Sequence, residues 1–140
     1  MHLPSVTTPI QIRFTDLDQL GHVSNSIYPQ YLDMGRIDLY HAIEAELKER
    51  DASEMQPINV VARLEIDFLS EIRLEHTVTV ETWCEHIGKK SMRLCQEIHT
   101  DGNCAARATV VLVGMDPKTR QTMIYPQHWL PAKKSASKNQ

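Results

Sequence analysis

The chain lacks a segment apolar enough to cross a membrane. Its longest apolar run, Ala108 to Met115, is interrupted by Thr109 and Gly114, whereas a membrane-spanning helix needs about 20 apolar residues. The N-terminus has neither the basic segment nor the apolar stretch of a secretory signal, and Pro4 interrupts the few apolar residues there. We therefore expect a cytoplasmic protein with no membrane partner.

Cysteine is scarce and shows no pairing motif. Cys84, Cys95 and Cys104 are odd in number, form no C-x-x-C motif and fall in segments that alternate like strands. Such cysteines are typical small buried apolar residues, and they fit a reducing compartment. His86 and His99 are near them in the sequence, so a metal site is the alternative. The pattern favours the apolar interpretation, and we predict no metal.

An excess of charge of one sign is also missing. Lys and Arg total 15 against 18 for Asp and Glu, a net charge of −3 at pH 7. No overall field therefore attracts the chain to nucleic acid or to an anionic membrane. The chain has none of the motifs G-x-S-x-G, G-x-G-x-x-G and H-E-x-x-H, nor a P-loop. Their absence argues against serine hydrolases, dinucleotide and nucleotide-phosphate binding, and zinc peptidases.

A length of 140 residues is typical of one domain with one core. We predict a single domain over residues 1–132. The tail at residues 133–140 contains three lysines and almost nothing to bury. We expect this tail to be disordered.

One long helix is expected near the start of the chain. From about Ser24 to Arg50 the apolar positions recur three or four residues apart, as they do along one stripe of a helix. Ser24, Asn25 and Ser26 all suit the N-cap position. Pro29 is tolerated only in the first turn, so the ordered helix is expected to begin nearer Ser26.

The other segments have the pattern of antiparallel strands. Apolar residues alternate over residues 10–14 and over residues 58–68, so each segment is expected to bury one face. Turns at residues 88–90 and at Asp101-Gly102 are expected to join further strands. The strands predicted after the helix are residues 58–68, 77–85, 91–99, 104–113 and a short edge strand at 122–124.

One strand, one long helix and then four or five strands in a row predict an α+β fold. A curled antiparallel sheet is expected to wrap around the single long central helix. Such a sheet leaves edges and one face open, so pairing with a second copy of the chain is expected.

The most informative stretch, residues 16–25, joins the first predicted strand to the helix. It places Asp18 just before a helix start. A helix start presents unpaired backbone N–H groups and the positive end of the helix dipole, which can hold a carbonyl oxygen that gains negative charge. Asp18 is then in place to attack the carbonyl or to activate water. The arrangement indicates hydrolysis of an ester or a thioester.

The same residues also have structural interpretations. Asp is common between a strand and a helix, so Asp18 can also be a turn carboxylate. Asp16 is interpreted as an acid that stabilises the turn. His22 either orients the catalytic acid or binds the loop backbone. Gly21 permits a backbone conformation or a close approach that a Cβ would block, and Tyr28 either packs in the core or lines a pocket.

Three sequence blocks together resemble the 4-hydroxybenzoyl-CoA thioesterase-like branch of the hotdog-fold superfamily. They are Arg13-Phe14-Thr15-Asp16-Leu17-Asp18, then Gly21-His22-Val23-Ser24-Asn25, then Tyr28, Tyr31-Leu32-Asp33 and Arg36. The resemblance covers residues 8–126. It implies a sheet that wraps a central helix, and acyl-CoA bound at a dimer interface. It also implies a homodimer at least, with a dimer of dimers as the larger alternative.

The resemblance implies an acyl-CoA thioesterase that releases the free acid and CoA and needs no cofactor. Its catalytic carboxylate falls on Asp18, as a nucleophile or as a general base. The backbone N–H that polarises the thioester carbonyl falls at Asn25. His22 is a further catalytic candidate. Many relatives have asparagine where this chain has Ser24.

The substrate-binding candidates come from the same blocks and from later turns. Basic residues are candidates for the phosphates of CoA, and Ser91 is a candidate for the pantetheine arm across the dimer. The full set is Gly21, Val23, Tyr28, Arg63, Lys89, Lys90 and Ser91. Two alternatives stay open: hydrolysis of an acyl chain on acyl carrier protein, and a non-catalytic acyl-CoA-binding or regulatory module.

Overall fold

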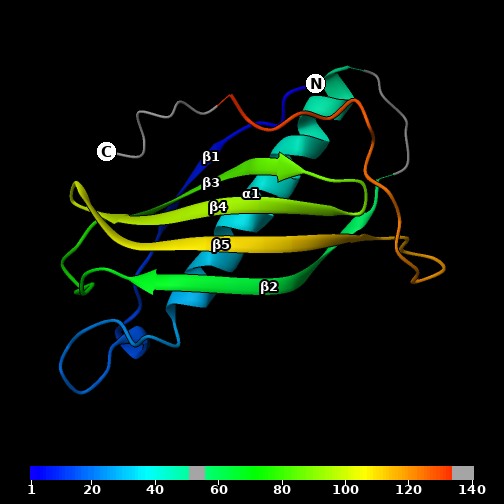
Figure 1. The fold of residues 1–140 in the computed structure, drawn as a ribbon. Helices are drawn as coiled ribbons and strands as arrows, with labels where there is room; N and C mark the ends of the chain where they lie inside the picture. The colour runs from blue at the N-terminus through cyan, green and yellow to red at the C-terminus, as the bar shows by residue number, and fades with distance from the viewer. Residues whose placement is uncertain (51–55, 134–140) are drawn as a thin grey trace.

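One long helix lies across one face of a curled antiparallel sheet (Figure 1). The structure is a computed structural model that describes residues 1–50 and 56–133. The elements are β1 (Val6–Ile10), a short 3-10 helix (Phe14–Asp16), α1 (Tyr28–Glu49), β2 (Ile58–Phe68), β3 (Val78–Ile87), β4 (Ser91–Thr100) and β5 (Asn103–Met115). The strand order is β1-β3-β4-β5-β2. The predicted α+β arrangement is confirmed.

Most of the strand predictions hold. β2 has the predicted bounds, and β3, β4 and β5 lie close to theirs. Asp101 and Gly102 have φ angles of 45° and 92°, as a two-residue hairpin turn requires. No helix among the described residues is long and apolar enough to span a membrane. The predicted tail lies, apart from Lys133, outside the described residues.

The first and last strand predictions are wrong. β1 ends at Ile10, which pairs with Val78; since β3 begins at Val78, no partner remains for a strand that continues to residue 14. The chain turns there instead, and Phe14 is 80% exposed. The edge strand predicted at 122–124 is a single bridge between Met115 and Thr122.

The helix begins later than predicted. Its N-cap is Ile27, which offers no side-chain cap, and Pro29 lies in the first turn as expected. Ser24 is unavailable as a cap because its backbone N–H donates to the Asp16 carbonyl (2.9 Å) and its carbonyl accepts from the Ile27 N–H (2.8 Å). The loop that carries the candidate site therefore extends to residue 27.

The helix and the sheet meet most closely at Gly35. A Cβ on Gly35 would lie 2.6 Å from Thr82 Oγ1 and 3.0 Å from Gln96 Nε2. The fully buried Gln96 joins the two layers, because its Nε2 donates to the Leu32 carbonyl and to Thr82 Oγ1 (both 2.9 Å), and its Oε1 accepts from Arg36 Nη1 (3.0 Å). The small residue and the amide together set the distance of α1 from the sheet.

The predicted burial of one face of β2 is wrong for a single copy of the chain. Within the described residues the backbone of α1 lies close to β1, β3 and β4 and not to β2, and α1 meets β2 through the ring contact of Tyr28 with Phe68. Val61, Leu64 and Phe68 are 43%, 36% and 49% exposed, although their β5 partners lie in the core. A register shift at Ala62 also puts Val60 on the opposite face from Leu64, because one unpaired residue reverses the alternation.

Replacement of Gly35 by alanine is expected to destabilise the protein. Alanine favours a helix over glycine by about 1 kcal/mol, but the new methyl group forces α1 away from Thr82 and Gln96, and overpacking of this kind costs about 1 to 3 kcal/mol. Urea unfolding measures the difference. Glu44→Ala on the exposed side of the same helix is the control, and a Gly35→Ala variant more stable than the wild type would contradict the close contact.

Candidate active site

The loop between β1 and α1 is held by its own backbone. The Asp18 N–H donates to the His22 carbonyl (2.8 Å), and the Gly21 N–H donates to the Asp18 carbonyl (3.1 Å). Gly21 has a φ of 79°, and no atom lies within 4 Å of a Cβ built there. The glycine is therefore required for its backbone conformation, and not for a close approach.

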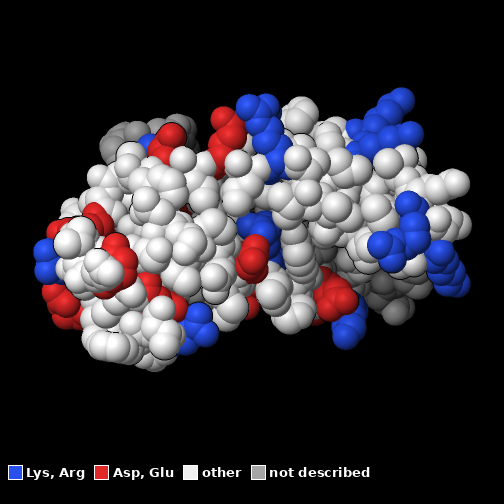
Figure 2. Space-filling model, turned by 90° about the horizontal axis from the view of Figure 1, so that it is seen from below, with Lys and Arg blue, Asp and Glu red and all other residues white. Residues whose placement is uncertain are grey.

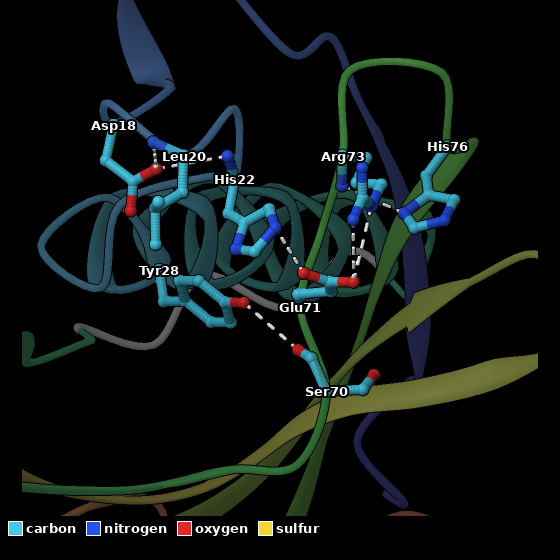
Figure 3. A network of polar contacts seen from close by, with 8 residues as sticks. All are labelled: Asp18, Leu20, His22, Tyr28, Ser70, Glu71, Arg73 and His76. Carbon is cyan, nitrogen blue, oxygen red and sulfur yellow. Dashed lines mark hydrogen bonds and ion pairs between the residues drawn. The ribbon is translucent and has the colours of Figure 1, made fainter.

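The predicted structural role of Asp18 is seen in one of its two carboxylate oxygens. One carboxylate oxygen, Oδ1, accepts the backbone N–H groups of Leu20 (2.9 Å) and His22 (3.1 Å) and so caps the loop (Figure 3). The other oxygen, Oδ2, accepts no hydrogen bond from the residues that the structure describes. The side chain is exposed. One oxygen is thus structural, and the other is available to a ligand or to water.

A cleft of about 260 Å³ opens beside this carboxylate. It brings together predicted site residues with a segment that follows β2. The lining residues are Asp18, His22, Val23, Asn25, Tyr28, Phe68, Leu69, Ser70 and Glu71. The sequence predictions missed the last four. They reach the cleft because the Val23 N–H donates to the Ile72 carbonyl (2.7 Å), a long-range contact with no local signal.

The backbone N–H of Asn25 is unpaired. Asn25 lies two residues before the N-cap of α1, and no described residue accepts a hydrogen bond from its amide. The late start of the helix explains this, because the intervening residues form a turn. Asn25 lines the same cleft as Asp18. A carbonyl that accepts from the Asn25 amide would therefore break no existing hydrogen bond.

His22 is held by Glu71 and not by the carboxylate of Asp18. Its Nε2 forms an ion pair with Glu71 Oε2 (Figure 3). The other oxygen of Glu71 accepts from Nε and Nη2 of Arg73 (3.3 and 3.2 Å). Only the backbone N–H of His22 contacts the Asp18 carboxylate. The imidazole therefore borders the cleft, fixed by a carboxylate from the segment after β2.

Tyr28 is both a core residue and a wall of the cleft. Its side chain is 2% exposed, its hydroxyl donates to the Ser70 carbonyl (3.2 Å), and its ring meets the Phe68 ring edge-on at 5.0 Å. Burial, with a contribution from the negative charge of Glu71, raises the pKa of Tyr28. The hydroxyl stays protonated at neutral pH and keeps its bond to the segment after β2.

Asp16 is 1% exposed, and its carboxylate fixes the start of the loop. Its Oδ1 accepts from Nε and Nη2 of Arg13 (3.1 and 3.0 Å), and its Oδ2 accepts from the Arg13 backbone N–H (3.0 Å) and the Tyr31 hydroxyl (2.8 Å). Burial disfavours the charged form, but these donors outweigh it and hold the pKa of Asp16 below its usual value. Asp16 is therefore an ionised structural residue.

A larger hollow of about 390 Å³ lies on the Asp16 side of the loop. It is lined by Pro9, Ile10, Gln11, Arg13, Asp16, Gln30, Tyr31 and Met34. Its only carboxylate has both oxygens occupied by donors, so it offers no free reacting group. The smaller cleft at Asp18 is the better candidate for chemistry, despite its smaller volume.

The remaining predicted substrate-binding residues lie away from the cleft of their own chain. Lys89 and Lys90 form the turn between β3 and β4, and Ser91 pairs with Val113 at the far end of β5. Arg63 lies on the uncovered strand β2, in an ion pair with Glu65 (3.2 Å). Figure 2 shows the same division of charge: acidic side chains gather at the end that carries the Asp18 loop, and basic ones at the opposite end.

Metal-ligating side chains do not converge in the cleft. Within residues 1–50 and 56–133, one group of three has ligand atoms close enough together to hold an ion, namely Glu97, His99 and Cys104. This group lies on β4 and β5, away from Asp18.

A free carboxylate oxygen and an unpaired amide, in a loop between a sheet and its single central helix, are groups of the kind that acyl transfer uses. The chain belongs to the thioesterase-like superfamily, whose family model matches residues 12–132. The match confirms the resemblance on the sequence blocks around Asp18, and with it thioester hydrolysis as the general chemistry of the family.

The chain is also similar to solved structures of thioesterases. A thioesterase from Thermus thermophilus, complexed with coenzyme A and Zn, is 30% identical over 86% of this chain and 85% of its own, with a TM-score of 0.73. A predicted thioesterase from Bacillus stearothermophilus is 28% identical over 88% and 89% of the two chains, with a TM-score of 0.72. These similarities confirm the hotdog fold. No curated protein matches the chain.

Replacement of Asp16 by asparagine is expected to lower stability in a pH-dependent way. The free energy of unfolding should fall by about 1.5 to 3 kcal/mol at pH 7, as for hydrogen bonds to a charged group. Because the pKa of Asp16 is lower in the folded state, its contribution is complete above about pH 4 and is lost as the pH falls through the folded-state pKa.

Urea unfolding of both proteins between acidic and neutral pH measures this difference. The gap between wild type and Asp16→Asn should be constant from neutral pH down to about 5 and should narrow below about 4. The exposed Asp67→Asn variant controls for loss of a charge. A gap that widens with acidity would refute the ionised Asp16.

Proposed function

We propose that the protein hydrolyses an acyl-CoA thioester to the free acid and CoA. Asp18 acts as the reacting carboxylate, and the Asn25 backbone N–H donates to the carbonyl oxygen. The observation that supports this assignment is that Asp18 and Asn25 line the same cleft, and that Oδ2 of Asp18 and the backbone N–H of Asn25 both lack a partner among the described residues. The superfamily supplies the general chemistry, and the cleft supplies the residues.

Two routes fit the geometry. Asp18 Oδ2 attacks the thioester carbon, the bond to sulfur breaks, and water then opens the mixed anhydride. Alternatively the same oxygen takes a proton from a water molecule that attacks in one step. In both routes negative charge develops on the carbonyl oxygen. The unpaired Asn25 N–H stabilises that charge, and the leaving thiolate takes up a proton.

The walls of the cleft suit the atoms next to a thioester. Val23, Tyr28 and Phe68 give an apolar side, and the Tyr28 hydroxyl is already bonded to Ser70. An acyl chain or the pantetheine arm can pack there without stranding a polar group. His22 stays a candidate catalytic residue through its place at the border, although its Nε2 is paired with Glu71.

We propose a homodimer formed along β2. β2 is an edge strand of 11 residues, and its free edge and exposed Val61, Leu64 and Phe68 are a surface that a second copy would cover. A two-fold axis pairs identical edges in antiparallel fashion. Since Phe68 also lines the cleft, the second copy would close the cleft over the Asp18 side.

Antiparallel pairing would also bring the basic end of one copy next to the acidic end of the other. The Asp18 cleft includes Phe68, where β2 ends (Figure 1), and the basic end of Figure 2 lies at the side where β2 begins. Lys89, Lys90 and Ser91 of a second copy would then face the CoA that enters the cleft, and the lysines would pair with its phosphates. Arg63 remains a weaker candidate because Glu65 already pairs with it.

The sequence predictions of a single domain over residues 1–132, a cytoplasmic location and no cofactor remain predictions, as does a dimer of dimers. A thioesterase acting on acyl carrier protein uses the same residues and differs only in the carrier. A non-catalytic acyl-CoA-binding module would use the same cleft and would bind without turnover.

Replacement of Asp18 by asparagine tests the proposal directly. The asparagine Oδ1 can still accept from Leu20 and His22, so the loop keeps its cap, while an amide group replaces the free oxygen. The kcat/KM for thiol release from a panel of acyl-CoA esters is expected to fall by about 10² to 10⁴-fold.

Asn25→Ala is the matched control, because it keeps the backbone N–H and should retain most of the activity. Acyl carrier protein esters, supplied in parallel, identify the carrier. Equal rates for wild type and Asp18→Asn would remove Asp18 from the mechanism. Saturable binding of every ester without turnover would favour the non-catalytic module.

A charge at the free face of β2 is expected to separate the dimer. Leu64→Asp places a carboxylate among apolar side chains that a second copy would bury, and an unpaired buried charge is strongly unfavourable. Sedimentation equilibrium should show a dimer for the wild type and a monomer for the variant, with loss of thioesterase activity. Glu65→Gln, on the other face of the strand, should stay dimeric; a monomeric wild type with full activity would refute the proposed interface.

A further inference from the structure

The face of the sheet opposite α1 carries a compact polar group at one end of β4 and β5. Glu97 and His99 project from β4, and Cys104 projects from β5 directly opposite His99. The register shifts here, so that Ala105 is unpaired between Cys104 and the next paired residue. The bulge keeps Cys104 on the same face as His99, where its thiol donates to the Ala106 carbonyl (3.3 Å). Glu81 of β3 lies opposite Glu97 on the same face.

The possible metal-ligand atoms of these side chains lie close together. His99 Nε2 lies 3.1 Å from Glu97 Oε1 and 3.3 Å from Glu81 Oε1. One ligand atom each from Glu97, His99 and Cys104 lie within 4.8 Å of one another. Zinc binds oxygen, nitrogen and sulfur ligands at about 2.0 to 2.3 Å. The ligand atoms around a bound zinc ion are therefore closer to one another than the 4.8 Å limit that holds for this group. Small side-chain rotations therefore suffice to enclose an ion.

The group is preorganised and carries excess negative charge. Glu97 is 5% exposed, and its Oε2 accepts from Arg107 Nε (2.9 Å), which leaves Oε1 directed at His99. Outer partners of this kind orient metal ligands. Two carboxylates face one guanidinium, and burial together with the charge of Glu97 raises the pKa of the Cys104 thiol. A bound cation would balance the carboxylates and would stabilise the thiolate.

We propose that Glu97, His99 and Cys104 bind a divalent cation of the zinc type as its three protein ligands. A carboxylate, imidazole and thiolate set is typical of Zn²⁺ and unlike the all-oxygen sites of Mg²⁺ and Ca²⁺. None of the site's three residues lines the Asp18 cleft, and the proposal does not depend on the proposed thioesterase activity. The site differs from the sequence prediction of no metal, because the register of β4 and β5, and not the spacing of the cysteines, assembles it.

Cobalt titration of the metal-free protein tests the site, since a cobalt–thiolate bond gives a charge-transfer absorption. The wild type should develop this band up to one equivalent of Co²⁺ per chain and lose it when Zn²⁺, but not Mg²⁺, is added. Cys104→Ser should abolish the band. Both Cys104→Ser and His99→Gln should weaken zinc binding by more than the roughly 10- to 100-fold that loss of an outer partner costs.

Cys95→Ser is the matched control. Like Cys104 of β5, Cys95 of β4 is a half-buried cysteine. Its sulfur contacts Glu85 and is not part of the group of three ligands, so loss of this thiol should leave the titration unchanged. Circular dichroism verifies that each variant is folded. Failure of the folded wild type to bind Co²⁺ or Zn²⁺ stoichiometrically, or equal zinc affinity in Cys104→Ser, would overturn the proposal.

Discussion

The buried carboxylate of Asp16 is the constraint on which the candidate site depends. Two oxygens receive four donors, three from Arg13 and one from Tyr31 of α1, and the backbone carbonyl of Asp16 holds the Ser24 N–H. The strand end, the loop and the helix are thereby tied at one point. Because charged hydrogen bonds inside a protein are strong and costly to leave unmade, the loop has little freedom, and Asp18 is held at the border of the cleft.

The site is assembled from surfaces that one chain leaves open. α1 covers β1, β3 and β4 among the described residues, and the uncovered strand β2 ends at the cleft. In the view of Figure 2, acidic side chains gather at that end and most basic ones at the other. The proposed second copy, paired along β2, would cover the exposed apolar side chains and would bring further positive charge toward the cleft.

The two faces of the sheet hold different chemistry for a physical reason. The face toward α1 is mostly apolar, and its buried polar side chains are paired, because a polar group there must find a partner within the core: Gln96 donates to the Leu32 carbonyl and to Thr82 Oγ1, and Thr8 Oγ1 donates to Asp38 of the helix. The opposite face has no helix over it and tolerates a charged group such as Glu81, Glu97, His99 and Arg107. Short cross-strand distances bring these side chains together, although they are far apart along the chain.

Local signals in the sequence were enough to predict several features. The alternation of apolar residues predicted the strands from β2 to β5, and the turn residues predicted the hairpin at Asp101-Gly102. The motif before the helix indicated which roles Asp18 can have. Only the tertiary structure decided where β1 ends, which face of β2 is covered, that Glu71 holds His22, and that Glu97, His99 and Cys104 meet. Those outcomes depend on strand register and on contacts between distant segments, which no local pattern encodes.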